Sequence, residues 1–372
     1  TTGANNTAYG RASLSVNTTG ANNTATGYQA LVANTTGAGN TATGAGALYS
    51  NTTGEDNVSV GRNSLYTNTT GIDNTALGVN SLGANTTGSE NVAVGEGSLD
   101  ANTTASSNTA VGRYSLGANT TGANNTGLGH QVLIYNTTGA ENTAVGKGAL
   151  DANTTANANV AVGVNALGAN TTGTSNTAVG LNALLANTTG DSNASLGKGS
   201  LDQNTTGAGN TGVGKGALYS NTTGANNIAI GQDAISSSAT VSSEITLGNS
   251  SNNNLRCNDT SISSLSDSRD KTNIVDIPLG LTFINTVRPV AFDWNRRDGS
   301  FVGKKDFGFI AQELKTAADA TDYADHIRLV HDNNPDKLEA DPMKMFPILV
   351  KAIQELSTKN DALVARITAL EA

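Results

Sequence analysis

The first 250 residues of this 372-residue chain contain no phenylalanine, no tryptophan and no proline. All six Phe, all five Pro and Trp294 lie after that point. Charge is divided in the same way, because only six of the 21 Lys and Arg residues belong to the first part. The chain therefore consists of two parts that differ in composition and in charge content.

Other absences exclude whole classes of protein. Cys257 is the single cysteine, so no intrachain disulfide can form. The net charge of −9 argues against a nucleic-acid partner, which needs a basic surface. No apolar run approaches the length of a membrane span, and no signal-peptide pattern is visible. We expect no cofactor.

A repeat dominates the part without aromatic residues. The segment Asn-Thr-Thr-Gly recurs every 17 residues from residue 17 to residue 221, with Ala in place of Gly at residues 105 and 156. With the incomplete first copy, residues 1–237 hold 14 copies of the consensus NTTGAxNTAVGxxALxx. Position 7 is always Asn, position 11 is always Gly, and position 15 is Leu in every copy except the last, which has Ile235. A register kept through so many copies implies a core and argues against a disordered tract.

The constant columns predict a stacked β structure. Thr-Ala-Val before the constant Gly indicates a short strand with one apolar face, and Ala-Leu supplies a second inward contact. The Gly marks backbone that takes positive φ or packs too closely for a Cβ. One unit cannot bury its own Val and Leu, but stacked copies can, with Leu on Leu and Asn on Asn. The Gly and β-branched content argues against helix.

Two stacked geometries fit the repeat. In the first, each repeat is one coil of a β-roll or β-solenoid, with a rise of ~4.8 Å per repeat. In the second, three chains run along a fibre axis and wrap together. We favour the first, because the NTAVG unit resembles the head repeats of trimeric autotransporter adhesins, which form β-rolls in trimers. The expected fold is therefore a mainly β, trimeric solenoid shaft.

Residues 238–265 depart from the repeat. They contain two short strand-like pieces, Ile245–Leu247 and Leu255–Cys257, among Ser and Asn. The segment is too small to be an independent receptor domain. We expect it to cap the shaft, because stacked repeats need cover for their last open edge. The chain starts at Thr1 within a repeat, so we also expect a further module upstream.

The last part, 266–372, carries a different set of motifs. They are Ser266-Asp267-x-Arg269-x-Lys271-x-Asn273-Ile274, then Arg288-Pro289-Val290, and then Gly308-Phe309-Ile310-Ala311-Gln312-Glu313. In this order, and followed by a long helix, they resemble the intramolecular chaperone domain of phage tailspikes and tail fibres of the endosialidase type. The resemblance implies an α+β domain that assembles three chains, drives folding of the shaft and then cuts the chain before its own serine.

The resemblance also implies the site residues. The scissile bond lies between Leu265 and Ser266, and the Ser–Lys dyad of the family maps onto Ser266 and Lys271. A lysine can activate a serine only when burial or a nearby cation depresses its pKa. Arg269 and Asp267 are candidate supporting residues, although a carboxylate opposes that depression. Residues five apart share no face of a helix or strand, so we expect a turn or a contact from a neighbouring chain.

The segment 346–372 predicts a coiled-coil helix. Ile and one Asn occupy position a of a heptad and Leu occupies position d, and the polar a residue fixes the register. This pattern alone favours two strands, so the homotrimer comes from the resemblance. A helix packed on its own domain is the alternative. The predicted seam consists of Leu349, Ile353, Leu356, Asn360, Leu363, Ile367 and Leu370.

The two halves explain each other. A uniform shaft can pair out of register, and a trimerising domain at one end removes that ambiguity. Cleavage then makes the stability of the shaft kinetic. We predict an adhesive tail fibre of a phage virion, made in the host cytoplasm and directed to a surface glycan or protein of the host. Its only enzymatic activity would be one self-cleavage per chain.

Three other functions compete with this prediction. A bacterial trimeric surface adhesin would need a C-terminal membrane anchor, for which the sequence gives no support. A glycan depolymerase would need paired carboxylates, and the acidic residues of the shaft do not recur as pairs. Ice binding fits the Thr columns at positions 2 and 3, and thermal hysteresis tests it. His326 and His331 lie near Asp325 and Asp332, but we predict no metal site there.

Overall fold

The computed structural model describes residues 2–252, 266, 268–296, 302–332 and 338–371. The chain divides into two compact units, Thr1–Asn249 and Ser250–Ala372. The first unit contains all the repeats, and the second contains the Phe, Pro and Trp residues.

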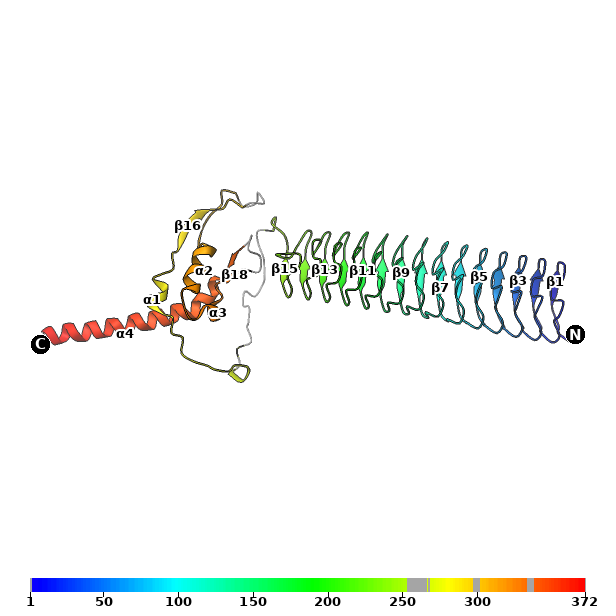
Figure 1. Cartoon of the computed structure of the whole chain (residues 1–372), viewed down its shortest axis with the longest axis horizontal. Coiled ribbons are helices and arrows are strands. Elements are labelled where there is room, and N and C mark those ends of the chain that lie inside the picture. Colours follow the sequence, from blue (N-terminus) through cyan, green and yellow to red (C-terminus); the bar gives the residue numbers. More distant parts are fainter. Residues whose placement is uncertain (1, 253–265, 267, 297–301, 333–337, 372) are drawn as a thin grey trace. The chain divides into compact units, whose positions relative to one another are not determined.

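The first unit is a parallel β-solenoid in which each repeat makes one coil (Figure 1). Each coil contributes one three-residue strand, which pairs in parallel with the strand 17 residues away, as Val160 does with Thr143 and Thr177. The predicted solenoid is therefore confirmed, and the extended-fibre geometry is excluded. Within the described residues the strands are β1 Thr7–Tyr9, β2 Thr24–Thr26, β3 Thr41–Thr43, β4 Val58–Val60, β5 Thr75–Leu77, β6 Val92–Val94, β7 Thr109–Val111, β8 Thr126–Leu128, β9 Thr143–Val145, β10 Val160–Val162, β11 Thr177–Val179, β12 Ala194–Leu196, β13 Thr211–Val213, β14 Ile228–Ile230 and β15 Ile245–Leu247.

The strand spacing runs one coil beyond the Asn-Thr-Thr-Gly motif. Ile228 of β14 pairs with Ile245 of β15, again 17 residues on. In this coil Glu244 replaces the constant Asn, and its backbone N–H still donates to Oδ1 of Asn227 at 2.9 Å. Part of the predicted cap is thus another coil. The other strand-like piece, Leu255–Cys257, lies outside the described residues.

Two ladders of buried asparagine hold the coils together. Nδ2 of Asn125 donates to the Gly139 carbonyl at 2.8 Å, and its Oδ1 accepts from the backbone N–H of Asn142 at 3.0 Å. In the second ladder, Nδ2 of Asn136 donates to Oδ1 of Asn119 at 2.8 Å. Buried amides with both donor and acceptor satisfied stabilise the stack, whereas unsatisfied ones would destabilise it. The predicted stacking of Asn on Asn is confirmed.

The leucine column adds the apolar core. Leu116 and Leu133 are fully buried, and each takes a left-handed backbone conformation with φ of 53° and 50°. A β-carbon disfavours this region, so a non-glycine residue there needs compensation from packing. Stacking of one Leu on the next supplies it. Leu on Leu was predicted, but the left-handed backbone was not.

One expectation about the core is wrong. Position 10 of the repeat, usually Val or Leu, was expected to be buried, but Leu128 and Leu196 are 47% and 52% exposed. The buried residue of each strand is the middle one, such as Ala144 or Ala161. Side chains of a strand alternate between faces, and the narrow coil admits only small residues inside. The larger residues of positions 8 and 10 therefore face outward.

The second unit is a small α+β fold that ends in a long helix. Phe283, Leu314, Ile327, Met345 and Ile348 form its core. Two antiparallel pairs, β16–β17 and β18–β19, accompany the helices. The elements are η1 Ser268–Asp270, α1 Leu281–Ile284, β16 Val290–Asp293, β17 Lys305–Gly308, α2 Ala311–Asp319, α3 Ala324–Ile327, β18 Val330–His331, β19 Glu339–Ala340, η2 Pro342–Met345 and α4 Phe346–Glu371.

Candidate functional site

The side chains of Ser266 and Lys271 meet at the start of the second unit. The short helix η1 turns the chain between them, with the Lys271 N–H donating to the Ser268 carbonyl at 3.3 Å. Nζ of Lys271 donates to Oγ of Ser266 at 2.6 Å and also lies 3.4 Å from the Ser266 carbonyl oxygen. A serine hydroxyl within hydrogen-bond reach of an amine is the arrangement that a Ser–Lys dyad requires.

The surroundings of this pair are open in the single chain. Ser266 and Lys271 are both exposed. Lys271 also lines a cavity of about 480 Å³ whose apolar wall includes Ile277, Tyr323 and Ile348. A lysine accepts a proton only in its neutral form, which removal from water favours. The two side chains lie within hydrogen-bond distance, and neither is removed from water in the single chain.

The remaining residues predicted around the dyad are only partly described. Arg269 is an exposed residue of η1. Leu265, on the other side of the predicted scissile bond, and Asp267 lie outside the described residues. Among the residues that are described, no three His, Cys, Asp or Glu side chains group closely enough to hold a metal ion.

An ion pair joins two of the sequence motifs. Nε of Arg288 donates to Oε2 of Glu313 at 3.0 Å, and a second nitrogen of the guanidinium contacts Oε1. This two-point contact connects the loop before β16 to the first turn of α2. The hydrogen bond from Arg288 lowers the pKa of Glu313. The motifs therefore fix the relative position of the hairpin and α2.

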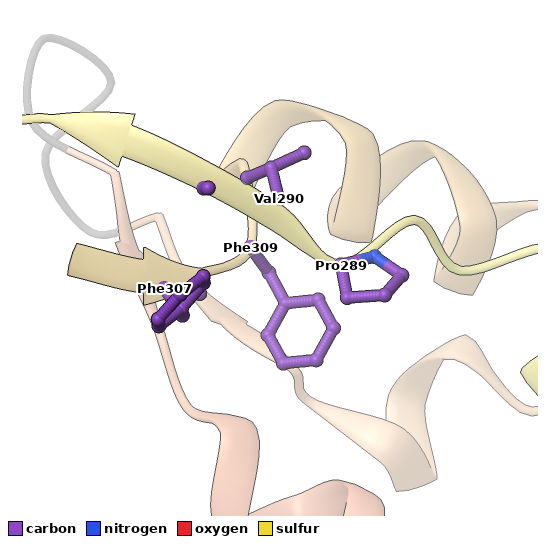
Figure 2. Close-up of a pocket in the computed structure, with 6 residues that line it drawn as sticks. Pro289, Val290, Phe307 and Phe309 are labelled. Atoms are coloured by element: carbon purple, nitrogen blue, oxygen red, sulfur yellow. The ribbon is translucent and has the colours of Figure 1, made fainter.

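The β16–β17 hairpin carries an exposed apolar patch (Figure 2). Phe307 is 85% exposed, and Pro289, Val290 and Phe309 line a cavity of about 490 Å³ beside it. Figure 2 shows the Pro289 and Phe309 rings on one side of β16 and Val290 on the other. Exposed rings of this kind are typical of protein–protein contact surfaces.

The terminal helix α4 uses different faces for its own domain and for the predicted seam. Ile348 and Ala352 are buried against the domain. The apolar seam residues all stay exposed, from 40% for Leu349 to 85% for Leu370. Beyond Glu355 the described helix extends past the rest of its unit (Figure 1). Its own domain therefore does not cover the predicted seam.

The shaft also presents a continuous uncharged surface of Thr and apolar side chains, which we call the outer strand face. It consists of positions 8 and 10 of every coil, from Thr7 and Tyr9 in β1 to Ile245 and Leu247 in β15, and none of these positions carries a charge. The face is about 70 Å long and about 10 Å wide, or ~700 Å² per chain. The sequence signal for it was position 9, which is always Ala, Ser, Gly or, in β15, Thr.

Comparison with known families gives one match. The family described as chaperone of endosialidase matches residues 266–324, which begin at Ser266 and include Lys271 and the Arg288–Glu313 pair. Neither the curated proteins nor the solved structures contain a match. In the described part of the chain, no helix is both long and apolar enough to cross a bilayer. The second unit thus contains a region similar to an intramolecular chaperone, and it follows a β-solenoid shaft.

Proposed function

We propose that this chain is part of a homotrimeric phage tail fibre. Its C-terminal domain assembles three chains, starts folding of the shaft from that end, and then cuts the bond between Leu265 and Ser266. The observation that carries the proposal is the 2.6 Å contact between Lys271 and Ser266, at the first residue of the match to a chaperone family. The mature shaft is an adhesive element of the virion, and each chain is synthesised in the host cytoplasm.

Three unpartnered surfaces, two apolar and one of mixed Thr and apolar residues, support assembly. They are the seam of α4, the patch around Phe307 and the outer strand face. The outer strand face alone offers about 700 Å² per chain, close to the ~800 Å² that each partner contributes to a stable interface. Two of the surfaces lie in the C-terminal unit, so chains that meet there bring their shafts together from one fixed end.

The cleavage chemistry follows from the position of Ser266 after the scissile bond. Neutral Lys271 accepts the Oγ proton while Oγ attacks the Leu265 carbonyl carbon. The C–N bond then breaks, and the lysine returns its proton to the nitrogen of Ser266, which leaves an ester between Leu265 and Oγ. Water hydrolyses that ester and restores the hydroxyl. In this scheme neighbouring chains cover the exposed dyad, so that cleavage follows assembly.

The test is denaturing electrophoresis and intact mass of freshly expressed protein beside Ser266→Ala, Lys271→Gln and a Lys359→Gln control, which changes an exposed lysine of α4. Wild type and control should yield a fragment that begins at Ser266, and both dyad variants should stay whole. Cleavage that persists in Ser266→Ala would remove the assigned nucleophile. If wild type also stays whole, the domain is a trimeriser only.

A second variant tests the order of events. Leu356→Lys with Leu363→Lys places charges in the seam and should prevent both trimer formation and cleavage. Lys359→Gln, on the same helix outside the seam, should leave both intact. Cleavage of a monomeric seam variant would show that assembly does not activate the dyad.

A further inference from the structure

A cavity of about 350 Å³ opens on the side of the shaft, between the coils that contain β12, β13 and β14. Its lining consists of Asn182, Lys198, Gly199, Asp202, Lys215, Gly216, Tyr219 and Asp233. These residues come from positions 12, 13 and 16 of successive repeats, so the cavity is a local departure from a periodic surface. It is separate from the dyad and from the chaperone region.

Comparison with equivalent coils explains why the shaft is open at this place. Gly97, Gly148 and Gly199 recur at position 13 every 51 residues, each three residues before an Asp. A Cβ at Gly97 would lie 2.6 Å from the Tyr114 ring, and one at Gly148 would lie 2.8 Å from Oδ1 of Asn165. At Gly199 the nearest atom would be 4.0 Å away, in Tyr219. We call the space beside the position-13 glycine the notch. It is filled at Gly97 and Gly148 and open at Gly199.

The coil that follows is the reason for this difference. Position 13 holds Tyr114 after Gly97 and Asn165 after Gly148, but it holds Gly216 after Gly199. Two consecutive glycines in this column occur nowhere else in the repeats. Because stacked coils place equal positions over one another, the second glycine withholds the side chain that would close the first notch.

The cavity lining combines two lysines, Lys198 and Lys215, with two carboxylates, Asp202 and Asp233. Lys198 and Lys215 occupy position 12 in consecutive coils, and no other consecutive coils share Lys or Arg in this column. Elsewhere in the column Arg113 pairs with Glu96 of the preceding coil at 3.0 Å. Neither lysine forms an ion pair or a side-chain hydrogen bond with any residue that the structure describes. The backbones of these two residues lie about one strand spacing apart, ~4.8 Å, and two ammonium groups without a partner in consecutive coils favour an anionic group of a ligand.

The remaining wall suits a hydroxylated ring. Asn182 lines the cavity, but its Oδ1 is buried, so the acceptors that the lining offers to a ligand are the carboxylates of Asp202 and Asp233. A carboxylate accepts hydrogen bonds from hydroxyl groups. Burial raises the pKa of Asp202. Tyr219 is 44% exposed, which leaves its ring accessible to the apolar face of a sugar.

We propose that this cavity, the Lys198 pocket, binds a carboxylated saccharide. The two lysines hold the carboxylate, Asp202 and Asp233 accept hydrogen bonds from ring hydroxyls, and Tyr219 packs against the ring. This assignment deepens the adhesive role proposed for the shaft and rests on it for its biological meaning. Binding itself is a property of the coils and can be measured apart from cleavage.

The test uses the full chain and isothermal titration with tetragalacturonate and sialyllactose as probes. At least one should bind, whereas uncharged maltotetraose and the peptide tetraglutamate should not. Lys198→Gln and Lys215→Gln should each weaken binding about tenfold. Gly199→Asn should abolish it by filling the notch. Asn63, Asn80, Asn165 and Asn182 occupy the same column with φ of 54–57°, so this variant should fold.

Lys147→Gln, in the same column outside the pocket, is the matched control and should bind as wild type does. The assignment is overturned if neither acidic saccharide binds, if tetraglutamate binds equally well, or if Gly199→Asn still binds. Sedimentation of the lysine variants separates the two proposals. A variant that loses trimers would place the pocket between copies and overturn the saccharide site, while the fibre proposal would stand.

Discussion

The carboxylate of Glu355 accepts a hydrogen bond from the backbone N–H of Leu281 at 2.8 Å and thereby attaches α4 to the start of α1. The preceding residue is Gly280, and a Cβ there would collide with the same carboxylate. The helix that carries the predicted seam is thus tied to the domain by a contact between residues far apart in sequence. Its orientation depends on this contact as well as on Ile348 and Ala352.

Glu355→Ala should destabilise the C-terminal unit by about 1.5–3 kcal/mol, because it removes a hydrogen bond to a charged acceptor from a partly buried donor. Trp294, the only tryptophan, lies in this unit and reports its unfolding by fluorescence in denaturant. Gln354→Ala, at an exposed neighbouring position, is the control. Equal unfolding midpoints for the two variants would contradict a structural role for the contact.

Leu128→Lys with Leu196→Lys should dissociate the shafts of a trimer, because it places charges within the uncharged outer strand face. Sedimentation of the purified protein measures the outcome, and circular dichroism checks that the solenoid remains folded. Thr138→Lys with Thr206→Lys places the same charges on exposed positions of another column. If both pairs leave the trimer intact, the outer strand face is not an interface.

Asn125→Asp should lower the stability of the shaft by several kcal/mol, because the new carboxylate cannot donate to the Gly139 carbonyl and becomes a buried charge. Asn124→Asp changes the adjacent residue in the same way at an exposed position, where Asp56 and Asp73 stand in other coils. It should be neutral. Thermal unfolding followed by circular dichroism compares them, and similar losses in both would argue against the ladder.

Asp100→Asn with Asp151→Asn should stabilise the shaft at pH 7. Burial raises the pKa of both carboxyl groups, so the folded shaft binds their protons more tightly than the unfolded chain does. Their contribution to stability therefore grows as the pH falls through the raised values toward the unfolded value of about 3.9. The advantage of the variant in melting temperature should shrink toward pH 4. A gain in melting temperature that does not change with pH would exclude burial of the carboxyl groups as its cause. An equal gain from Asp73→Asn would exclude it as well.

Much of the shaft could be predicted from sequence because a constant column has one structural meaning in every coil. A Leu or Asn repeated at a fixed spacing must stack on itself, which predicted both the core and the ladders. The prediction that Val and Leu at position 10 of the strands point into the core was wrong. A strand of three residues has too little alternation to show which face is inside, and the decisive signal was the small residue at position 9.

The site was predictable only in outline. Pairing of Ser266 with Lys271 required a turn, which the sequence could demand but not locate, and η1 places it at Ser268–Asp270. The Lys198 pocket depends on which residues coincide in one column of successive coils. That comparison has meaning only once a repeat is known to be a coil. The patch around Phe307 depends on tertiary contacts of the hairpin, for which the local sequence carries no periodic signal.

The uniform register of the solenoid has a consequence for how such a chain can evolve. Each coil presents the same two surfaces to its neighbours, so loss or duplication of any 17-residue unit leaves every column continuous. Recombination between like repeats in the gene can therefore change the length of the fibre in steps of ~4.8 Å without a new folding problem. The length of the shaft and its surface sites can vary independently of the C-terminal domain.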